Sequence, residues 1–429
     1  MTSRTHRCVI SLVDNILTWG LTGIVCSLRV SVIAPSSPTS VNIDTQLICF
    51  LLGALFGSPA ADDGDGSWES LDFHQQVFML SGFSNVIRAE RKTLRELQAS
   101  ALVNVTIPVR TVGWQVVWGP VVWKSDPDNE SGPDHVWFVA KKLTHGDEDI
   151  YVISVAGSAT IYNTLVNNAG VIPVVNFTTW APDAPPTPSL IPTSSMAPYI
   201  SLGTAMGVHT LESYPAPAGA AGAGQTLPVF LKNAPRGSSS QFIFTGLSLG
   251  GTLTSTLALR LVKPDADIFP DTVSVLTYPI ACVSPGNVHF ANAFAARFPK
   301  LLGPGYKVWN GNIANLLDVA TNAWSTDDNQ PLYLDRIRRI YGNEPITGIE
   351  SGIDLAKIAA DKSGMVYIPL QSTIFRSSIP FNPPTNELEF IGIAALQHSV
   401  AYEAFFGVRL SGAGGVKESL FPDVVIGIV

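Results

Sequence analysis

The hydrophobic and polar positions of the chain follow two different periods. Between residues 68 and 100, the apolar residues Phe73, Val77 and Leu80 recur at helical spacing. The charged run over residues 88–97 is typical of a solvated helix face. This part of the chain is therefore predicted to be helical.

Short apolar runs bounded by polar turn residues predict strands over residues 114–123, 135–143, 150–157 and 170–179. From there the two patterns alternate, with a helix beginning near Ser201, strands over 241–247, 271–281 and 306–310, and helices over 249–262 and 287–298. Such alternation is typical of a parallel sheet with crossover helices. We therefore expect one α/β domain over residues 66–429, with a mostly parallel central sheet flanked by helices.

The N-terminal residues 1–62 are expected to lie outside this fold. Residues 47–66 have the apolar run and the small residues of a signal peptide, with cleavage expected near Ala60 or Ala61. The sequence thus predicts secretion. Attachment to a membrane through the apolar residues 8–28 is the alternative.

Composition narrows the class of protein. Hydrophobic residues make up 46% and charged residues 14% of the chain, which is typical of a globular protein. The net charge of −8 and the lack of a long basic run argue against nucleic acid as a partner. Three Asn-x-Ser/Thr triplets fit a secreted glycoprotein, and they begin at Asn104, Asn129 and Asn176.

The cysteines argue against both a disulfide framework and a metal centre. Three of the four lie within the first 50 residues, and Cys282 is expected to be a buried structural thiol. We expect neither a metal nor an organic cofactor, because the sequence has no cluster of His, Cys and Asp ligands.

A proline-rich segment over residues 181–199 interrupts the pattern of strands and helices. Its six prolines exclude a long helix, because proline lacks the amide hydrogen and clashes with the preceding turn. The segment also contains the apolar residues Leu190, Ile191 and Met196. Two interpretations stay open: a rigid surface linker, and a lid whose apolar side covers a hydrophobic cleft.

The sequence GLSLG over residues 246–250 joins a predicted strand to a predicted helix. Gly246 and Gly250 would allow a sharp turn that exposes the Ser248 hydroxyl at the helix N-terminus. This pattern predicts a catalytic nucleophile. A serine that only caps the helix is the alternative.

A serine nucleophile requires a base and an acid that orients the base. Only His289 and His398 follow Ser248, and His289 falls inside a predicted amphipathic helix. The chain order Ser, acid, His therefore favours His398 as the base. Asp318, shortly after the predicted strand 306–310, is the preferred acid over three candidates in more polar surroundings, Asp327, Asp328 and Asp335.

Four segments within residues 103–410 resemble the class 3 (fungal-type) lipases. They are IFTGLSLGGTLTSTLALRL (243–261), TYPIACVSPGNVHFANAF (277–294), NLLDVATNAW (315–324) and QHSVAY (397–402). The resemblance implies an α/β-hydrolase fold with Ser248 as nucleophile, Asp318 as orienting acid and His398 as base.

The resemblance also implies an oxyanion hole. VISVAGSAT (152–160) is similar to the family's strand ending in R-G-T or R-G-S, which implies the backbone amide of Ser158 as one donor and that of Leu249 as the other. A plain turn residue is the alternative for Ser158. The sequence departs from the family pattern at Leu247, where histidine is usual, and at Ala156, where arginine is usual.

A third departure, Ala320-Thr321 in place of V-P after the acid, leaves loop geometry and substrate preference open. The resemblance implies a serine carboxylic ester hydrolase, and we expect a secreted triacylglycerol lipase that acts through an acyl-enzyme on lipid at an interface with water. The alternatives are an esterase for soluble or cell-wall aromatic esters, similar to feruloyl esterases, and a catalytically silent hydrolase-like binding protein.

Overall fold

The computed structural model describes residues 70–143, 148–160, 167–168, 170–182, 184–189, 196–237 and 239–410. The predicted signal peptide, the alternative anchor over residues 8–28 and the boundary near residue 62 all lie outside these ranges. Among the described helices, none has both the length and the apolar composition that crossing a membrane requires.

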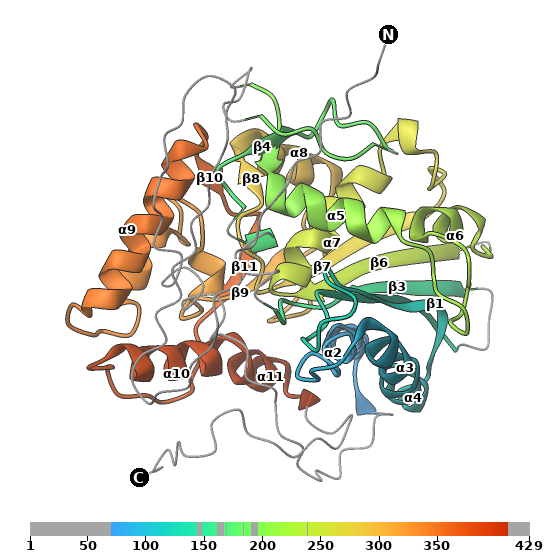
Figure 1. The fold of residues 1–429 in the computed structure, drawn as a ribbon, viewed down its shortest axis with the longest axis horizontal. Coiled ribbons are helices and arrows are strands. Elements are labelled where there is room, and N and C mark those ends of the chain that lie inside the picture. Colours follow the sequence, from blue (N-terminus) through green and yellow to red (C-terminus); the bar gives the residue numbers. More distant parts are fainter. Residues whose placement is uncertain are drawn as a thin grey trace. The chain divides into compact units, whose positions relative to one another are not determined.

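A seven-stranded sheet runs through the centre of the described residues, in the order β1-β2-β3-β6-β7-β9-β11 (Figure 1). The first three strands pair antiparallel, whereas every pair from β3 to β11 is parallel. Because parallel strands end at the same edge, the loops after β3, β6 and β9 meet there. The strands are β1 (Trp114–Trp123), β2 (His135–Lys142), β3 (Glu148–Val155), β6 (Ser239–Leu247), β7 (Ser274–Ile280), β9 (Asn312–Asn315) and β11 (Ser372–Phe375).

Helices pack on both faces of this sheet. In β6, Phe242 and Phe244 join the apolar core on one face, whereas Ile243 joins the core on the other, as the alternation of side chains along a strand requires. The Phe242 face carries α5 (Leu202–Ser213), α6 (Leu227–Asn233), α7 (Leu249–Leu261) and α8 (Val288–Arg297). The Ile243 face carries α2 (Phe73–Phe83), α3 (Leu94–Asn104), α4 (Thr106–Thr111) and α11 (Val400–Phe406).

A third core cluster contains Trp324, Tyr341 and Phe390 and lies beneath the C-terminal helices. A small second sheet, in the order β10-β8-β5-β4, contributes Tyr367 and Tyr199 to it. The elements of this part are β4 (Val174–Asn176), β5 (Tyr199–Ser201), β8 (Gly286–Asn287), β10 (Tyr367–Ile368), η4 (Ala320–Asn322), η5 (Leu334–Arg339), α9 (Thr347–Lys362) and α10 (Glu387–His398).

The structure corrects three predicted elements. The helix expected over residues 68–100 is two helices, because α2 ends at Phe83 and a new helix, α3, begins at Leu94, after a capping box of Thr93 and Glu96. The strand expected over 170–179 is only the three residues of β4, which follow a proline. The strand expected over 306–310 is wrong, since the strand before Asp318 is β9.

The proline-rich segment has no helix in its described residues, as its prolines require. Leu190 and Ile191 of the candidate lid lie outside the described residues, and Met196 is exposed. Whether the segment is a lid therefore stays a prediction.

Candidate active site

Ser248 lies at a sharp turn between β6 and α7. Its φ of 59° and ψ of −125° are strained for a residue with a side chain, and its amide donates to the Ile280 carbonyl over 2.8 Å. A Cβ on Gly246 would lie 2.6 Å from the Gly250 carbonyl oxygen, and one on Gly250 would lie 2.8 Å from the Ala156 carbonyl oxygen. Only glycine fits at both positions, so the tight turn depends on both of them.

The side chain of Ser248 has no role in capping α7. Ser248 occupies the N-cap position, yet its hydroxyl makes no capping hydrogen bond. Leu249 follows as the first residue of α7, so its amide is among those that have no acceptor within the helix. The positive end of the helix dipole lies at the same point. Hydrogen bonding within the helix therefore uses neither the Ser248 hydroxyl nor the Leu249 amide.

Asp318 and His398 come together although 80 residues separate them. The Nδ1 atom of His398 lies 3.0 Å from Oδ1 and 2.9 Å from Oδ2 of Asp318, and both side chains are buried. An ionised carboxylate only accepts hydrogen bonds, so Nδ1 carries the proton. In the neutral imidazole, Nε2 then has the lone pair that a general base needs.

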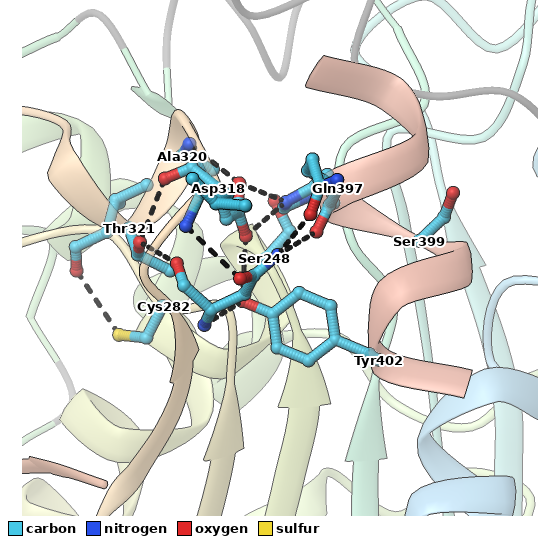
Figure 2. A network of polar contacts seen from close by, with 12 residues as sticks. Ser248, Cys282, Asp318, Ala320, Thr321, Gln397, Ser399 and Tyr402 are labelled. Atoms are coloured by element: carbon cyan, nitrogen blue, oxygen red, sulfur yellow. Dashed lines mark hydrogen bonds and ion pairs between the residues drawn. The ribbon is translucent and has the colours of Figure 1, made fainter. Parts of the chain in front are cut away.

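Two further groups orient the Asp318 carboxylate. The Ala320 amide donates to Oδ1 over 2.9 Å, and the Tyr402 hydroxyl donates to Oδ2 over 2.8 Å. Burial and the charge of Asp318 raise the pKa of Tyr402 well above its usual value, which keeps the hydroxyl a donor. The Asn315 amide in turn donates to the Tyr402 hydroxyl over 3.0 Å. Figure 2 shows Ser248, Asp318 and Tyr402 within one network of polar contacts.

The rival candidates for the catalytic base and acid are not part of the pair formed by Asp318 and His398. His289 is half-buried on α8, and the Asp335 carboxylate pairs with Arg338 and Lys357. Burial raises the pKa of the Cys282 thiol to about 12, which makes it inert as a nucleophile. In the described ranges, no three His, Cys, Asp or Glu side chains come close enough together to hold a metal ion.

The loop after β3 lies directly beside the nucleophile. A Cβ on Gly157 would lie 3.5 Å from the Cβ of Ser248 and 3.0 Å from the Leu247 carbonyl oxygen. Ser158 follows in this loop and is fully buried. The geometry therefore brings the segment 157–158 against the turn that carries Ser248.

Three side chains from outside this loop hydrogen-bond to it. Oδ1 of Asn85 accepts from the Gly157 amide over 2.9 Å, and Nη2 of Arg88 donates to the Ser158 carbonyl over 2.9 Å. Nδ2 of Asn168 donates to the Ser158 hydroxyl over 2.8 Å. The sequence patterns gave no signal for these contacts, because all three residues lie outside the recognised motifs.

Two more supporting residues lie at the ends of motifs that the sequence shows. Asn315 opens the segment NLLDVATNAW, and Tyr402 closes the segment QHSVAY. Nδ2 of Asn315 donates to both the backbone and the side-chain oxygen of Gln397, each over 2.9 Å, directly before His398. The ends of the two motifs thus join the acid loop to the histidine helix.

A comparison with known families bears on this geometry. Residues 198–312 match the family model for lipase (class 3), a range that contains Ser248 and α7. Over this range, about a quarter of its length, the chain is similar to the class 3 lipases. The match indicates a lipase-like carboxylic ester hydrolase. The matched range ends before Asp318 and His398, so the pairing of these residues is an observation of the structure.

One solved structure shares the fold of this chain, and two others match it less well. M37 lipase has a TM-score of 0.63 at 23% identity, covering 80% of this chain and 95% of its own, which shows a shared fold. The triacylglyceride lipase of Rhizomucor miehei matches at 14% identity and a TM-score of 0.35, over 57% of this chain and 72% of its own. A triacylglycerol lipase from Penicillium expansum matches at 16% identity and a TM-score of 0.32, over 62% and 75%. No curated protein matches the chain.

Proposed function

We propose that the protein is a lipase that hydrolyses esters of long-chain fatty acids, triacylglycerols among them, through Ser248, Asp318 and His398. Nε2 of His398 takes the proton of the Ser248 hydroxyl as its oxygen attacks the ester carbonyl. The imidazolium then gives that proton to the leaving alcohol, which produces an acyl-enzyme. A water molecule, deprotonated by the same imidazole, releases the fatty acid.

The charge that develops on the carbonyl oxygen needs donors that are already in position. The amides of Ser158 and Leu249 are the proposed pair, since the loop of Ser158 contacts the Ser248 turn and Leu249 begins α7. Losing one such donor typically lowers turnover by about 10²- to 10³-fold.

The observation that carries the proposal is the buried hydrogen bond between Asp318 and Nδ1 of His398, in a chain whose Ser248 occupies a strained strand-to-helix turn. The test is Ser248→Ala, with Ser255→Ala on α7 as the matched control, because its hydroxyl only bonds to the Gly251 carbonyl. We expect Ser248→Ala to lose ester hydrolysis and labelling by a fluorophosphonate while staying folded. Retained hydrolysis in the folded variant would exclude the scheme.

The choice of substrate is tested with the wild-type enzyme. A rate that rises steeply when a triacylglycerol forms an emulsion supports the lipase. Turnover of soluble feruloyl esters alone would support the esterase instead. A wild-type protein that takes up no fluorophosphonate at Ser248 would support a silent binding protein.

We also propose that the protein is secreted after cleavage near Ala60 or Ala61. The sequence pattern of a signal peptide supports this step, and the three Asn-x-Ser/Thr triplets are consistent with it. N-terminal sequencing of the protein from the culture medium tests it. A protein that stays with the membrane fraction and retains residues 8–28 would favour the anchor.

A further inference from the structure

The turn that follows α2 presents two polar side chains to the loop beside the nucleophile. The backbone amide of Asn85 donates to the Gly82 carbonyl over 2.9 Å, and the backbone amide of Arg88 donates to the backbone carbonyl of Asn85 over 3.1 Å. Asn85 and Arg88 therefore belong to one hydrogen-bonded turn. This turn comes from the face of the sheet opposite to α7, so the loop is contacted from one face and the nucleophile is supported from the other.

The orientation of the Asn85 amide is fixed by the end of α2. Its Nδ2 atom donates to the Ser81 carbonyl over 2.9 Å and lies 3.3 Å from the Ser84 hydroxyl. The oxygen of the same amide must then point the other way, where it accepts from the Gly157 amide over 2.9 Å. A rotation of the side chain would break these bonds together, so the acceptor is held in place for Gly157.

Arg88 brings a positive charge to the same loop. Its Nη2 atom donates to the Ser158 carbonyl over 2.9 Å, a charge-assisted bond of the stronger kind. The strand itself has no charge here, because Ala156 occupies the position at which the family motif has arginine. The guanidinium at this loop thus comes from a segment 70 residues earlier in the chain.

These two bonds hold the peptide groups on either side of the Ser158 amide. Asn85 binds the amide of the peptide group before it, and Arg88 binds the carbonyl of the peptide group after it. We propose that Asn85 and Arg88 are positioning residues that hold the Ser158 amide at the oxyanion of the reaction. This inference rests on the proposed function, since it assigns the support of one of its two oxyanion donors.

Both residues act through the Ser158 amide, so their effect is on the transition state. An error of about 1 Å in the placement of a reacting group can lower a rate by about a hundredfold. Neither residue is proposed to contact the substrate. We therefore expect changes at Asn85 and Arg88 to lower kcat and to leave KM nearly unchanged.

The experiment uses Asn85→Ala, Arg88→Met and Arg88→Lys with a soluble nitrophenyl ester. We expect kcat/KM to fall by about tenfold to a hundredfold in the first two variants, a part of the loss expected when a donor is removed outright. Arg88→Lys keeps the charge and loses the planar fork, so its loss should be intermediate. The control is Lys92→Met, because this exposed lysine pairs with Glu90 and not with the loop.

A second readout separates positioning from a merely structural role. An alkylboronic acid forms a tetrahedral adduct with the nucleophile that places an oxygen at the oxyanion position. Its inhibition constant, measured on titrated active enzyme, should rise by the same factor by which kcat/KM falls. A lower kcat/KM with an unchanged inhibition constant would overturn the inference, as would wild-type kinetics in folded Asn85→Ala and Arg88→Met.

The failure of the inference and the failure of the proposed function are distinguishable. If Ser248→Ala stays active, the proposed function fails whatever the other variants do. If Ser248→Ala is inactive and the variants of the turn behave like wild type, only the positioning role fails. Should Arg88→Met not fold, Asn85→Ala carries the same test, because it removes a single neutral acceptor.

Discussion

Replacing Tyr402 by phenylalanine removes one hydroxyl from the support of the acid and keeps the ring. The ring is fully buried and packs edge-on against Phe375 at a centroid distance of 5.3 Å, a contact that phenylalanine preserves. Two hydrogen bonds are lost: the bond of 2.8 Å to Oδ2 of Asp318 and the bond of 3.0 Å from the Asn315 amide. The variant therefore isolates the hydroxyl from the packing.

The magnitude follows from what remains on the carboxylate. A hydrogen bond to a charged group contributes about 1.5–3 kcal/mol, so we expect the free energy of unfolding to fall by about that amount. The Ala320 amide still holds Oδ1 over 2.9 Å, and Nδ1 of His398 still donates to Asp318. We expect kcat/KM to fall by only about tenfold, equivalent to about 1.4 kcal/mol, because the imidazole keeps its tautomer.

The assay combines urea unfolding with hydrolysis of a soluble ester. The matched control is Tyr278→Phe, which removes a buried hydroxyl whose bond of 2.6 Å goes to the Tyr306 carbonyl. Both variants should lose stability, and only Tyr402→Phe should lose activity. A Tyr402→Phe protein that is destabilised as expected and has the wild-type kcat/KM would refute the argument that this hydroxyl supports the acid.

Three further predictions concern other buried charges. Asp318→Asn should lower kcat by about 10⁴-fold in a folded protein, because the amide cannot stabilise an imidazolium; a loss below tenfold in steady-state assays would contradict this. Burial raises the pKa of Glu403 to about 7 from 4.5, so the stability of the folded protein falls as pH rises through that window. Relative to wild type, the free energy of unfolding of Glu403→Gln, measured in urea, should therefore increase by about 2–3 kcal/mol between pH 4.5 and pH 8. A difference between the two proteins that does not change with pH would count against this prediction. Arg260→Met should cost about 3–5 kcal/mol by the same method, because it removes one member of the buried ion pair that Arg260 forms with Glu212 over 2.8 Å, whereas a loss below 1 kcal/mol would speak against a role for this pair.

The sequence predicted the local elements well where side chains alternate cleanly. Residues 114–123 form β1 with the predicted limits, and residues 249–262 form α7 to within one residue. The strand before the acid was missed for a physical reason. In β9 both Asn312 and Asn315 are buried, and asparagine in a short run reads as a turn. Their burial is compensated by long-range hydrogen bonds, such as the one from the Cys282 amide to Oδ1 of Asn312 over 3.0 Å.

The candidate site likewise contains residues that local sequence patterns predict and residues that only long-range contacts bring to it. Residues that do the proposed chemistry stand in local motifs, because a strand-to-helix turn or a loop at a strand end places them. Several residues that orient them are joined to the site by contacts across the fold: 84 residues separate Tyr402 from Asp318, and 72 separate Asn85 from Gly157. No periodicity spans such distances, so the pairing of these residues can be found only in the structure, even where a residue itself lies in a motif.

The same separation allows a motif residue to change while the contacts around the loop after β3 are kept. Ala156 removes a charge from the strand beside the nucleophile, and Arg88 supplies a guanidinium to the same loop from another segment. The proposed role requires a hydrogen-bond donor within reach of the Ser158 carbonyl oxygen. Any element of the fold that brings a donor to that position can provide it. We therefore expect the departure at Ala156 to leave the support of the Ser158 carbonyl in place, because Arg88 provides the hydrogen bond to it.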